Sequence, residues 1–151
     1  MKLSTKMRYG TRAMLDLALN YGNGVVSVRE IAARQQISAK YLEQLLASLR
    51  AAGLVRSVRG TQGGHILTRP PDQINLREIY NTFDGTEGFV ECTTGPEICD
   101  KRDVCVAQEI WAQMYTACME ILESTTLEDL ARRARDKLRN VRHNLATEVA
   151  P

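Results

Sequence analysis

Two helix-start signals separated by a short turn constrain the fold of this chain more than any other feature. Ser27 and Glu30 form the S-x-x-E pattern, in which each side chain accepts a hydrogen bond from an unpaired backbone N–H at a helix start. Ser38 marks a second helix start directly after the residues QQI. Gly53 then suits the left-handed conformation that ends many helices. Residues 27–53 are therefore predicted to form two helices joined by a tight turn.

Apolar spacing supports this prediction and adds a helix before it. Within residues 39–52 the leucines recur at helical spacing and are expected to face the interior, namely Leu42, Leu45, Leu46 and Leu49. Polar side chains near the start of the same helix face outward. Residues 8–21 also carry apolar side chains at helical spacing and are followed by GNG, which ends a helix. This arrangement is typical of a helix-turn-helix domain.

The period of the sequence changes after Gly53. Two short extended runs, LVRSV and HILTR, flank the segment RGTQGG and are closed by two prolines. They predict a β-hairpin with a basic tip, which forms a wing beside the helix-turn-helix. Arg59 at the tip is suited to a narrow minor groove, where the negative potential is enhanced. The plainer interpretation is a surface hairpin whose glycines only make the turn.

The rest of the chain predicts a short helix, a loop and a long helix. Asn75 and Glu78 form a capping pattern for a helix that ends near residue 83. The long helix, 104–123, carries an apolar stripe consisting of Val104, Ala107, Trp111, Met114, Tyr115, Cys118, Ile121 and Leu122. Because its own chain offers this helix few neighbours, we expect it to pair with its copy in a second subunit. The residues expected in that dimer interface are Trp111, Met114, Tyr115 and Cys118.

The predicted fold class is mostly α with a small β-hairpin wing, and the chain divides into four parts. Residues 1–83 form a winged helix-turn-helix domain, and residues 84–105 form a loop that carries three cysteines. Residues 103–131 form the dimerisation helix and a following short helix. The basic tail, 132–151, is expected to be a frayed helix or disordered.

Charge is distributed unevenly along the chain. Residues 1–70 carry 11 Lys and Arg against 3 Asp and Glu, residues 71–130 carry 3 against 13, and residues 131–151 carry 6 against 2. The net charges are therefore +8, −10 and +4. A basic N-terminal half favours a surface for a polyanion, although a solvated charged face gives the same pattern. With the helix-turn-helix it predicts double-stranded DNA as the partner, and a palindromic operator for a homodimer.

Nothing in the sequence indicates a membrane protein. No apolar stretch approaches the roughly 20 residues that span a bilayer, and no apolar run of signal-peptide length follows the N-terminus. The protein is therefore expected to be cytoplasmic, with no membrane partner. In a reducing cytosol, clustered cysteines bind metal or do redox chemistry more often than they form disulfides.

Three of the four cysteines lie in the segment ECTTGPEICDKRDVC, as Cys92, Cys99 and Cys105. Thiolates select iron-sulfur clusters, zinc or Cu(I), and three cysteines leave one coordination position open. Zinc sites favour cysteines about two to four residues apart, and this segment lacks that spacing. The residues alone thus favour a cluster, with zinc, and no metal at all, as alternatives.

Candidates for a fourth ligand lie close to Cys105 in the sequence. Glu109 shares the cysteine's face of the predicted helix and offers a carboxylate, whereas Gln108 offers a neutral amide oxygen. Cys118 lies about 220° around the helix from Cys105 and about 20 Å along it, so it is interpreted as a packing residue.

The sequence resembles the IscR-like iron-sulfur cluster regulators, within the winged-helix group that also includes NsrR and CymR. The resemblance extends from Met1 to about Ala131, and the stretches that carry it are MKLSTKMRYGTRAMLDLAL, ISAKYLEQLLASLRAAGLVRSVRGTQGGHIL and the three-cysteine loop. It implies a homodimeric transcription factor that represses cluster-assembly genes when it holds a 2Fe-2S cluster. It also implies Cys92, Cys99 and Cys105 as the ligands.

This chain departs from the IscR-like pattern at the fourth ligand. IscR-like proteins usually have a histidine three residues after the last cysteine, where this chain has Gln108. Related sensors use a ligand from the first helix of the other subunit, a role for which Arg8 is poorly suited. The fourth ligand therefore stays open, and a 4Fe-4S cluster is an alternative to 2Fe-2S.

The resemblance also maps a DNA-reading surface onto this chain. The recognition-helix positions are Ser38, Ala39, Lys40, Tyr41, Glu43 and Gln44, and the wing positions are Arg59 and Gly60. In IscR-like proteins the glutamate at the position of Glu43 is linked to discrimination between two classes of DNA site. The basic residues expected to contact phosphates are Lys2, Lys6, Arg8, Arg50 and Arg56. Each of them alone is also compatible with a solvated charge.

Three classes of function are compatible with the sequence. The first is a transcription regulator that senses cluster status, and the second is a regulator of the same fold that senses nitric oxide, iron or thiol state. The third, an electron-transfer protein, would have no need of a wing or a basic N-terminal half. An enzyme with a small-molecule substrate is not expected, because no acid–base pair, activated nucleophile or phosphate-cradling loop is evident.

Overall fold

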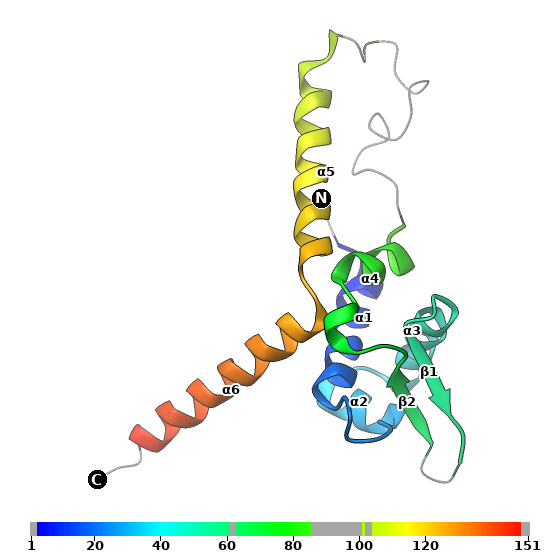
Figure 1. The fold of residues 1–151 in the computed structure, drawn as a ribbon, viewed down its shortest axis with the longest axis vertical. Helices are drawn as coiled ribbons and strands as arrows, with labels where there is room; N and C mark the ends of the chain where they lie inside the picture. Colours follow the sequence, from blue (N-terminus) through cyan, green and yellow to red (C-terminus); the bar gives the residue numbers. More distant parts are fainter. Residues whose placement is uncertain (1–2, 61–62, 86–100, 102–103, 149–151) are drawn as a thin grey trace.

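The computed structural model describes residues 3–60, 63–85, 101 and 104–148, with side chains described up to residue 141. Its elements, in chain order, are α1 (Thr5–Leu19), α2 (Val28–Gln35), α3 (Ala39–Ala51), β1 (Val55–Val58), β2 (Gly64–Leu67), the 3-10 turn η1 (Pro71–Gln73), α4 (Leu76–Phe83), α5 (Val106–Ser124) and α6 (Leu127–Glu148). The first seven form a rounded body, from which α5 and α6 project in different directions (Figure 1). The predicted fold class, mostly α with a β-hairpin wing, is confirmed.

The helix-turn-helix begins and ends where the sequence signals predict. Ser27 and Glu30 form the reciprocal pair of backbone-to-side-chain hydrogen bonds, at 2.8 and 3.2 Å. The turn between the two helices passes through Gln36, which takes the left-handed conformation (φ 54°). The Ser38 hydroxyl accepts from the backbone N–H of Tyr41 (3.3 Å) and so starts α3. Gly53 follows α3 with φ +74°.

The wing is a two-stranded antiparallel hairpin that is anchored to the body at one edge. Val55 pairs with Leu67 and Val58 with Gly64. Val26, just before α2, adds backbone hydrogen bonds to His65 on the outer edge of β2, at 3.0 and 2.8 Å. Gly64 is needed there, because a Cβ atom would stand 2.4 Å from the Val26 carbonyl oxygen. The hairpin is therefore held against the helix-turn-helix by the backbone itself.

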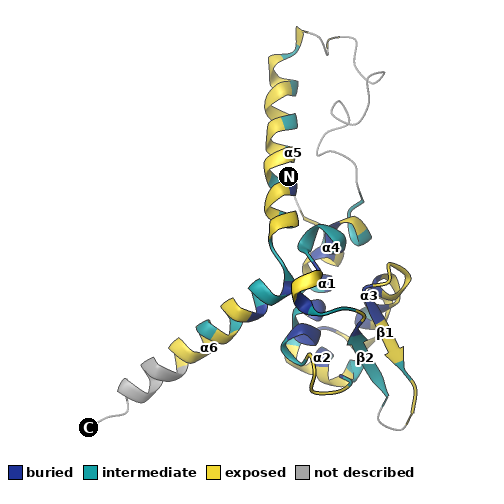
Figure 2. Cartoon of the chain, in the orientation of Figure 1, coloured by how far each residue is buried: buried dark blue, intermediate teal, exposed yellow. Residues whose placement is uncertain are grey.

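The core lies between α1, α3, α4 and the inner face of the hairpin, as the dark blue segments of Figure 2 show. The predicted leucines of α3 are buried, each with at most 2% of its surface exposed: Leu42, Leu45, Leu46 and Leu49. One sequence prediction about α1 was wrong. This helix begins after a Ser4 cap and ends at Leu19, so Tyr21 lies beyond it and is 47% exposed. The Ser4 hydroxyl, which accepts from the backbone N–H of Met7, moves the helix start ahead of the predicted residue 8.

A buried carboxylate joins α1 to α2. Asp16 is 2% exposed and accepts hydrogen bonds from Arg34, the shortest 2.7 Å, and from the Gln35 amide (3.0 Å). The same hydrogen bonding raises the pKa of Arg34 above its ordinary value. This contact fixes the first helix of the helix-turn-helix on α1.

We expect the Arg34→Ala variant to unfold more easily than the wild type by about 3 kcal/mol, because it leaves the Asp16 carboxylate buried without a countercharge. This figure is the low end of the range for buried pairs, since the Arg34 side chain is 43% exposed. Urea denaturation measures the difference. Arg29→Ala, at an exposed position of the same helix, is the matched control and should change stability by less than about 0.5 kcal/mol. Equal free energies of unfolding for Arg34→Ala and Arg29→Ala would show that the Asp16–Arg34 pair contributes nothing to stability.

The link between α5 and α6 is tied to the start of α4. The backbone N–H groups of Leu76 and Leu127 donate to the carbonyls of Thr125 (3.0 Å) and Ile74 (2.9 Å). Asn75 and Glu78 form the predicted capping box. The C-terminal end of α5 and the N-terminal end of α6 are therefore joined to the body.

The last helix is longer than the short helix expected from the sequence. It starts at a reciprocal Thr126–Asp129 cap and continues to Glu148. Ion pairs along its surface support it, namely Arg132–Asp129, Arg135–Glu128 and Arg139–Asp136. The part of the tail from 132 to 148 is thus helical. Within the described residues, no helix is long and apolar enough to cross a membrane.

Candidate DNA interface and metal centre

The first turns of α3 present polar side chains away from the core. The residues expected to read DNA are exposed here, namely Ser38, Ala39, Lys40, Glu43 and Gln44. Tyr41 differs from them, because its ring is partly buried against the core. The four buried leucines fix the rotation of α3 and so keep the polar face outward.

The wing extends this surface. Arg56, Arg59 and Gly60 are exposed on the hairpin, and Gly60 has φ +132°, a conformation that favours glycine. Arg50, near the end of α3, donates to the Ser57 hydroxyl on β1 (3.2 Å). Arg50 therefore links the wing to the recognition helix. The sequence prediction gave it only a phosphate contact.

Charged side chains of the recognition helix affect the pKa of His65, which lies on the wing. Its Nδ1 is 3.4 Å from the Ser57 hydroxyl. Burial lowers the pKa of His65 below its ordinary value, Arg50 lowers it further, and Glu43 acts in the opposite direction. The charges of Glu43 and of the wing thus belong to one surface.

Helix α1 adds basic side chains beside the start of α3. Lys6 and Arg8 are exposed, as a phosphate contact requires, whereas Lys2 lies outside the described residues. The sequence prediction missed Arg12, which donates to the Gln35 side chain (3.1 Å) and to the Gln35 carbonyl. Its position four residues after Arg8, on the same helix face, is the signal that could have revealed it.

Two rings connect α1 to the recognition helix. The guanidinium groups of Arg8 and Arg12 lie 5.9 and 5.4 Å from the centre of the Tyr9 ring. The same ring meets the Tyr41 ring edge to face, with 6.0 Å between their centres. The basic face of α1 and the first turn of α3 are therefore in direct contact.

Of the three clustered cysteines, the structure describes Cys105 alone; Cys92 and Cys99 lie outside the described residues. Cys105 is the partly buried N-cap of α5. Gln108 donates its backbone N–H to the Cys105 carbonyl (3.1 Å), and Glu109 is exposed in the same first turn. In the described part of the chain no three His, Cys, Asp or Glu side chains lie close enough to hold a metal ion. The donor set of three thiols fits a soft metal centre by its chemistry.

Cys118, the fourth cysteine, lies on α5, outside the clustered segment. Together with Tyr115 it packs against the core. Burial raises the pKa of the neighbouring Tyr80. Cys118 is thus a packing residue in this structure, as its distance from Cys105 along the helix predicted.

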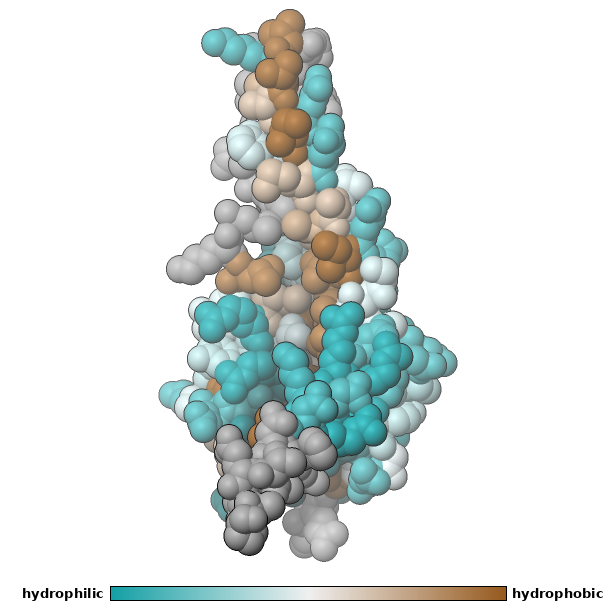
Figure 3. Space-filling view, turned by 90° about the vertical axis from the view of Figure 1, so that its left-hand side faces the viewer, coloured by the Kyte–Doolittle hydropathy of each residue, from teal (hydrophilic) through white to brown (hydrophobic). Residues whose placement is uncertain are grey.

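The outer face of α5 is apolar and exposed. Its residues recur at alternating intervals of three and four, namely Ala107, Ile110, Met114, Ala117 and Ile121. Trp111 and Met114 are each 43% exposed. Figure 3 shows the apolar side chains gathered along the upper part of the molecule, above a hydrophilic lower body. The stripe predicted from the sequence is therefore divided: Tyr115 and Cys118 face this chain's own core, while Trp111 and Met114 stay uncovered.

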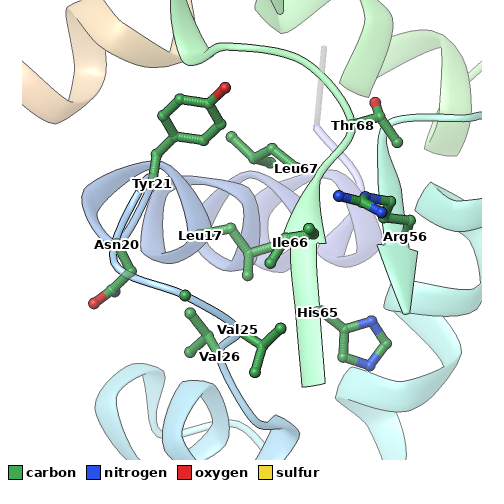
Figure 4. Close-up of a pocket in the computed structure, with 12 residues that line it drawn as sticks. Leu17, Asn20, Tyr21, Val25, Val26, Arg56, His65, Ile66, Leu67 and Thr68 are labelled. Carbon is green, nitrogen blue, oxygen red and sulfur yellow. The ribbon is translucent and has the colours of Figure 1, made fainter. Parts of the chain in front are cut away.

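A pocket of about 410 Å³ lies between the end of α1 and the hairpin (Figure 4). Its floor is formed by Leu17, Val26 and Leu67, and Arg56 and Thr68 lie at one side. Among the described residues, its lining contains no cysteine and no carboxylate but does include His65.

Comparison with known proteins decides the class of this molecule. Residues 3–133 match the family model Rrf2, described as an iron-dependent transcriptional regulator. The chain belongs to the Rrf2 family. Like its relatives, this Rrf2 protein is a DNA-binding transcriptional regulator and not an enzyme.

Two relatives and two structures illustrate the similarity. The HTH-type transcriptional regulator CymR of Bacillus subtilis is 42% identical over 131 residues, which cover 87% of this chain and 90% of CymR. The regulator IscR of Sodalis glossinidius is 41% identical over 130 residues, covering 86% and 78%. The structure of CymR, described as the global cysteine regulator of B. subtilis, has a TM-score of 0.76 at 41% identity and covers 88% of this chain and 98% of its own. T. potens IscR has a TM-score of 0.73 at 42% identity, covering 89% and 88%.

Proposed function

We propose that this Rrf2 protein senses iron-sulfur cluster status through its three clustered cysteines and regulates cluster-assembly genes, as a repressor in its cluster-bound form. The observation that carries the proposal is where the cysteine segment sits. It begins directly after α4, which packs on the DNA-binding body, and it ends at Cys105, the cap of the exposed helix α5. A change in this loop therefore acts on both the DNA-binding and the proposed dimer parts.

The ligands proposed are Cys92, Cys99 and Cys105, with Glu109 or Gln108 as the fourth. When bound, a 2Fe-2S or 4Fe-4S cluster supplies metal–thiolate bonds that tie these positions together. Glu109 is exposed one turn after Cys105. A weak or exchangeable fourth ligand suits a sensor, because it leaves the site responsive to supply.

The protein is proposed to act as a homodimer on a palindromic operator. Trp111 and Met114 lie on the uncovered face of α5, and a twofold axis along that face would bury it against its copy. The alternating three and four spacing of the exposed stripe is the pattern that lets two helices pack along a seam. Two subunits then present two recognition helices to two half-sites.

Each subunit is proposed to read bases with the exposed start of α3, through Ser38, Lys40, Glu43 and Gln44, and to place Arg59 in the minor groove. Glutamate accepts from cytosine N4, and glutamine pairs with adenine. Lys6, Arg8 and Arg56 are proposed as phosphate contacts, and the exposed position of Arg12 on the same helix supports including it.

A second candidate function is a regulator of the same fold that senses nitric oxide, iron or thiol state. Two observations favour it. Gln108 stands where IscR-like proteins have histidine, and a relative at 42% identity is CymR, whose structure is described as that of a global cysteine regulator. A sensor of thiol state differs from the first candidate in that its purified protein holds no cluster.

Substitution of Glu43 tests the DNA-reading part of the proposal. In the cluster-free form, the unpaired carboxylate of Glu43 repels DNA sites that lack a well-placed cytosine. Glu43→Ala should therefore raise the affinity of the cluster-free protein for such sites by roughly 5- to 150-fold, the equivalent of one base contact. Arg59→Ala, the comparison variant, should weaken both forms at all sites. Fluorescence anisotropy at one fixed salt concentration measures both, because phosphate contacts make affinity depend on salt. An equal loss in both forms of Glu43→Ala would make Glu43 an ordinary base contact.

A further inference from the structure

The start of the cysteine loop rests on α1. The ring of Phe83, the last residue of α4, lies so close to Gly10 that a Cβ atom at Gly10 would stand 2.1 Å from a ring carbon. The next residue, Asp84, accepts a hydrogen bond from the backbone N–H of Ser4 (3.1 Å). The point where the loop leaves the body is therefore fixed to the first turns of α1.

The start of the recognition helix rests on the same part of α1. Tyr9, the neighbour of Gly10, meets Tyr41 with ring planes at 90°, a geometry that aromatic pairs prefer. Tyr41 is the third residue of α3, and its backbone N–H binds the Ser38 hydroxyl that caps the helix. Both rings, like that of Phe83, are partly buried against the core. Tyr9 thus packs against the turn of α3 that carries the DNA-reading residues.

We propose that Tyr9 is a positioning residue through which the state of the cysteine loop sets the first turn of the recognition helix. The inference rests on the proposed function, since it names how that function reaches DNA. Tyr9 acts through Tyr41 and not by touching a base. Packed side chains shift between discrete arrangements instead of deforming smoothly. A movement of Phe83 and Asp84 against α1 is therefore proposed to shift the contact between Tyr9 and Tyr41.

The test compares DNA affinity with and without cluster in three variants. Tyr9→Leu removes the ring but keeps an apolar side chain, Tyr9→Phe keeps the ring, and Tyr21→Leu removes an exposed tyrosine just after α1. The probe is a labelled duplex recovered from a random-sequence pool by the cluster-loaded wild type. The ratio of the two affinities, roughly 5- to 150-fold for a typical coupling, should fall below about 3-fold in Tyr9→Leu and persist in the other two.

A second substitution tests the other end of the path. Phe83→Leu loosens the contact with Gly10 and should lower the same ratio. If both changes act on one path, the double variant Tyr9→Leu/Phe83→Leu should lower the ratio no further than either change alone. Should Tyr9→Leu fail to fold, Phe83→Leu decides the question by itself.

The outcomes separate this inference from the proposed function. A folded Tyr9→Leu variant that keeps its visible spectrum and the wild-type ratio overturns the inference and leaves the proposed function standing. A wild type that takes up no cluster, or that binds DNA equally in both forms, overturns both. An affinity loss in Tyr9→Leu that is equal in the two forms is a structural effect and also counts against the inference.

Discussion

Anaerobically purified Cys105→Ala protein is expected to be colourless, and Cys92→Ala and Cys99→Ala likewise. Three thiolates are the proposed anchors, and alanine offers no ligand, so each variant should lose the visible absorption and the bound iron of the wild type. Cys105 caps α5 without a side-chain hydrogen bond, so its loss should leave the helices intact. Visible absorption and iron analysis measure the cluster, and circular dichroism measures the fold.

Cys118→Ala is the matched control for these variants. Cys118 packs against the core, so its replacement should lower stability by about 1 kcal/mol through the lost packing and should leave the colour unchanged. A colourless Cys118→Ala protein would contradict the ligand set. Colour retained in any one of the three loop variants would remove that cysteine from it.

Met114→Glu is expected to turn the proposed homodimer into monomers. The side chain lies in the middle of the exposed stripe of α5, so in a twofold interface each subunit would bury one unpaired carboxylate. At about 3 kcal/mol for each buried charge, self-association should weaken by at least a hundredfold, since every 1.4 kcal/mol is about tenfold. Sedimentation velocity over a range of protein concentrations measures the change.

Thr116→Glu adds the same charge on the same helix and serves as the control. Thr116 is exposed and lies about 140° around the helix from the centre of the stripe, at 100° for each residue. This variant should remain dimeric. A Met114→Glu protein that sediments as the wild-type dimer would place the subunit interface elsewhere.

Local signals explain why so much of the DNA-binding half could be predicted. Hydrogen bonds within three residues determine the helix starts at Ser27, with Glu30, and at Ser38. The leucines of α3 determine a buried face by spacing alone. The structure confirms both, because each depends only on neighbours in the chain.

Contacts between distant segments could not be predicted in this way. The Asp16–Arg34 pair joins residues 18 positions apart, and nothing in the local pattern shows that Asp16 is buried. The α5 stripe looked continuous in the sequence, yet α4 covers part of it and leaves Met114 uncovered. Helix α6 extends into the expected tail, supported by its Thr126–Asp129 cap and its ion pairs.

The most direct test of the sensor account is the affinity of the wild-type protein for one operator duplex with and without its cluster. The duplex is selected by the cluster-loaded protein, and both titrations use the same salt concentration. If the cysteine loop controls DNA binding, the two dissociation constants should differ by roughly 5- to 150-fold, with the loaded form tighter. Equal constants for a protein that demonstrably holds a cluster would contradict the account.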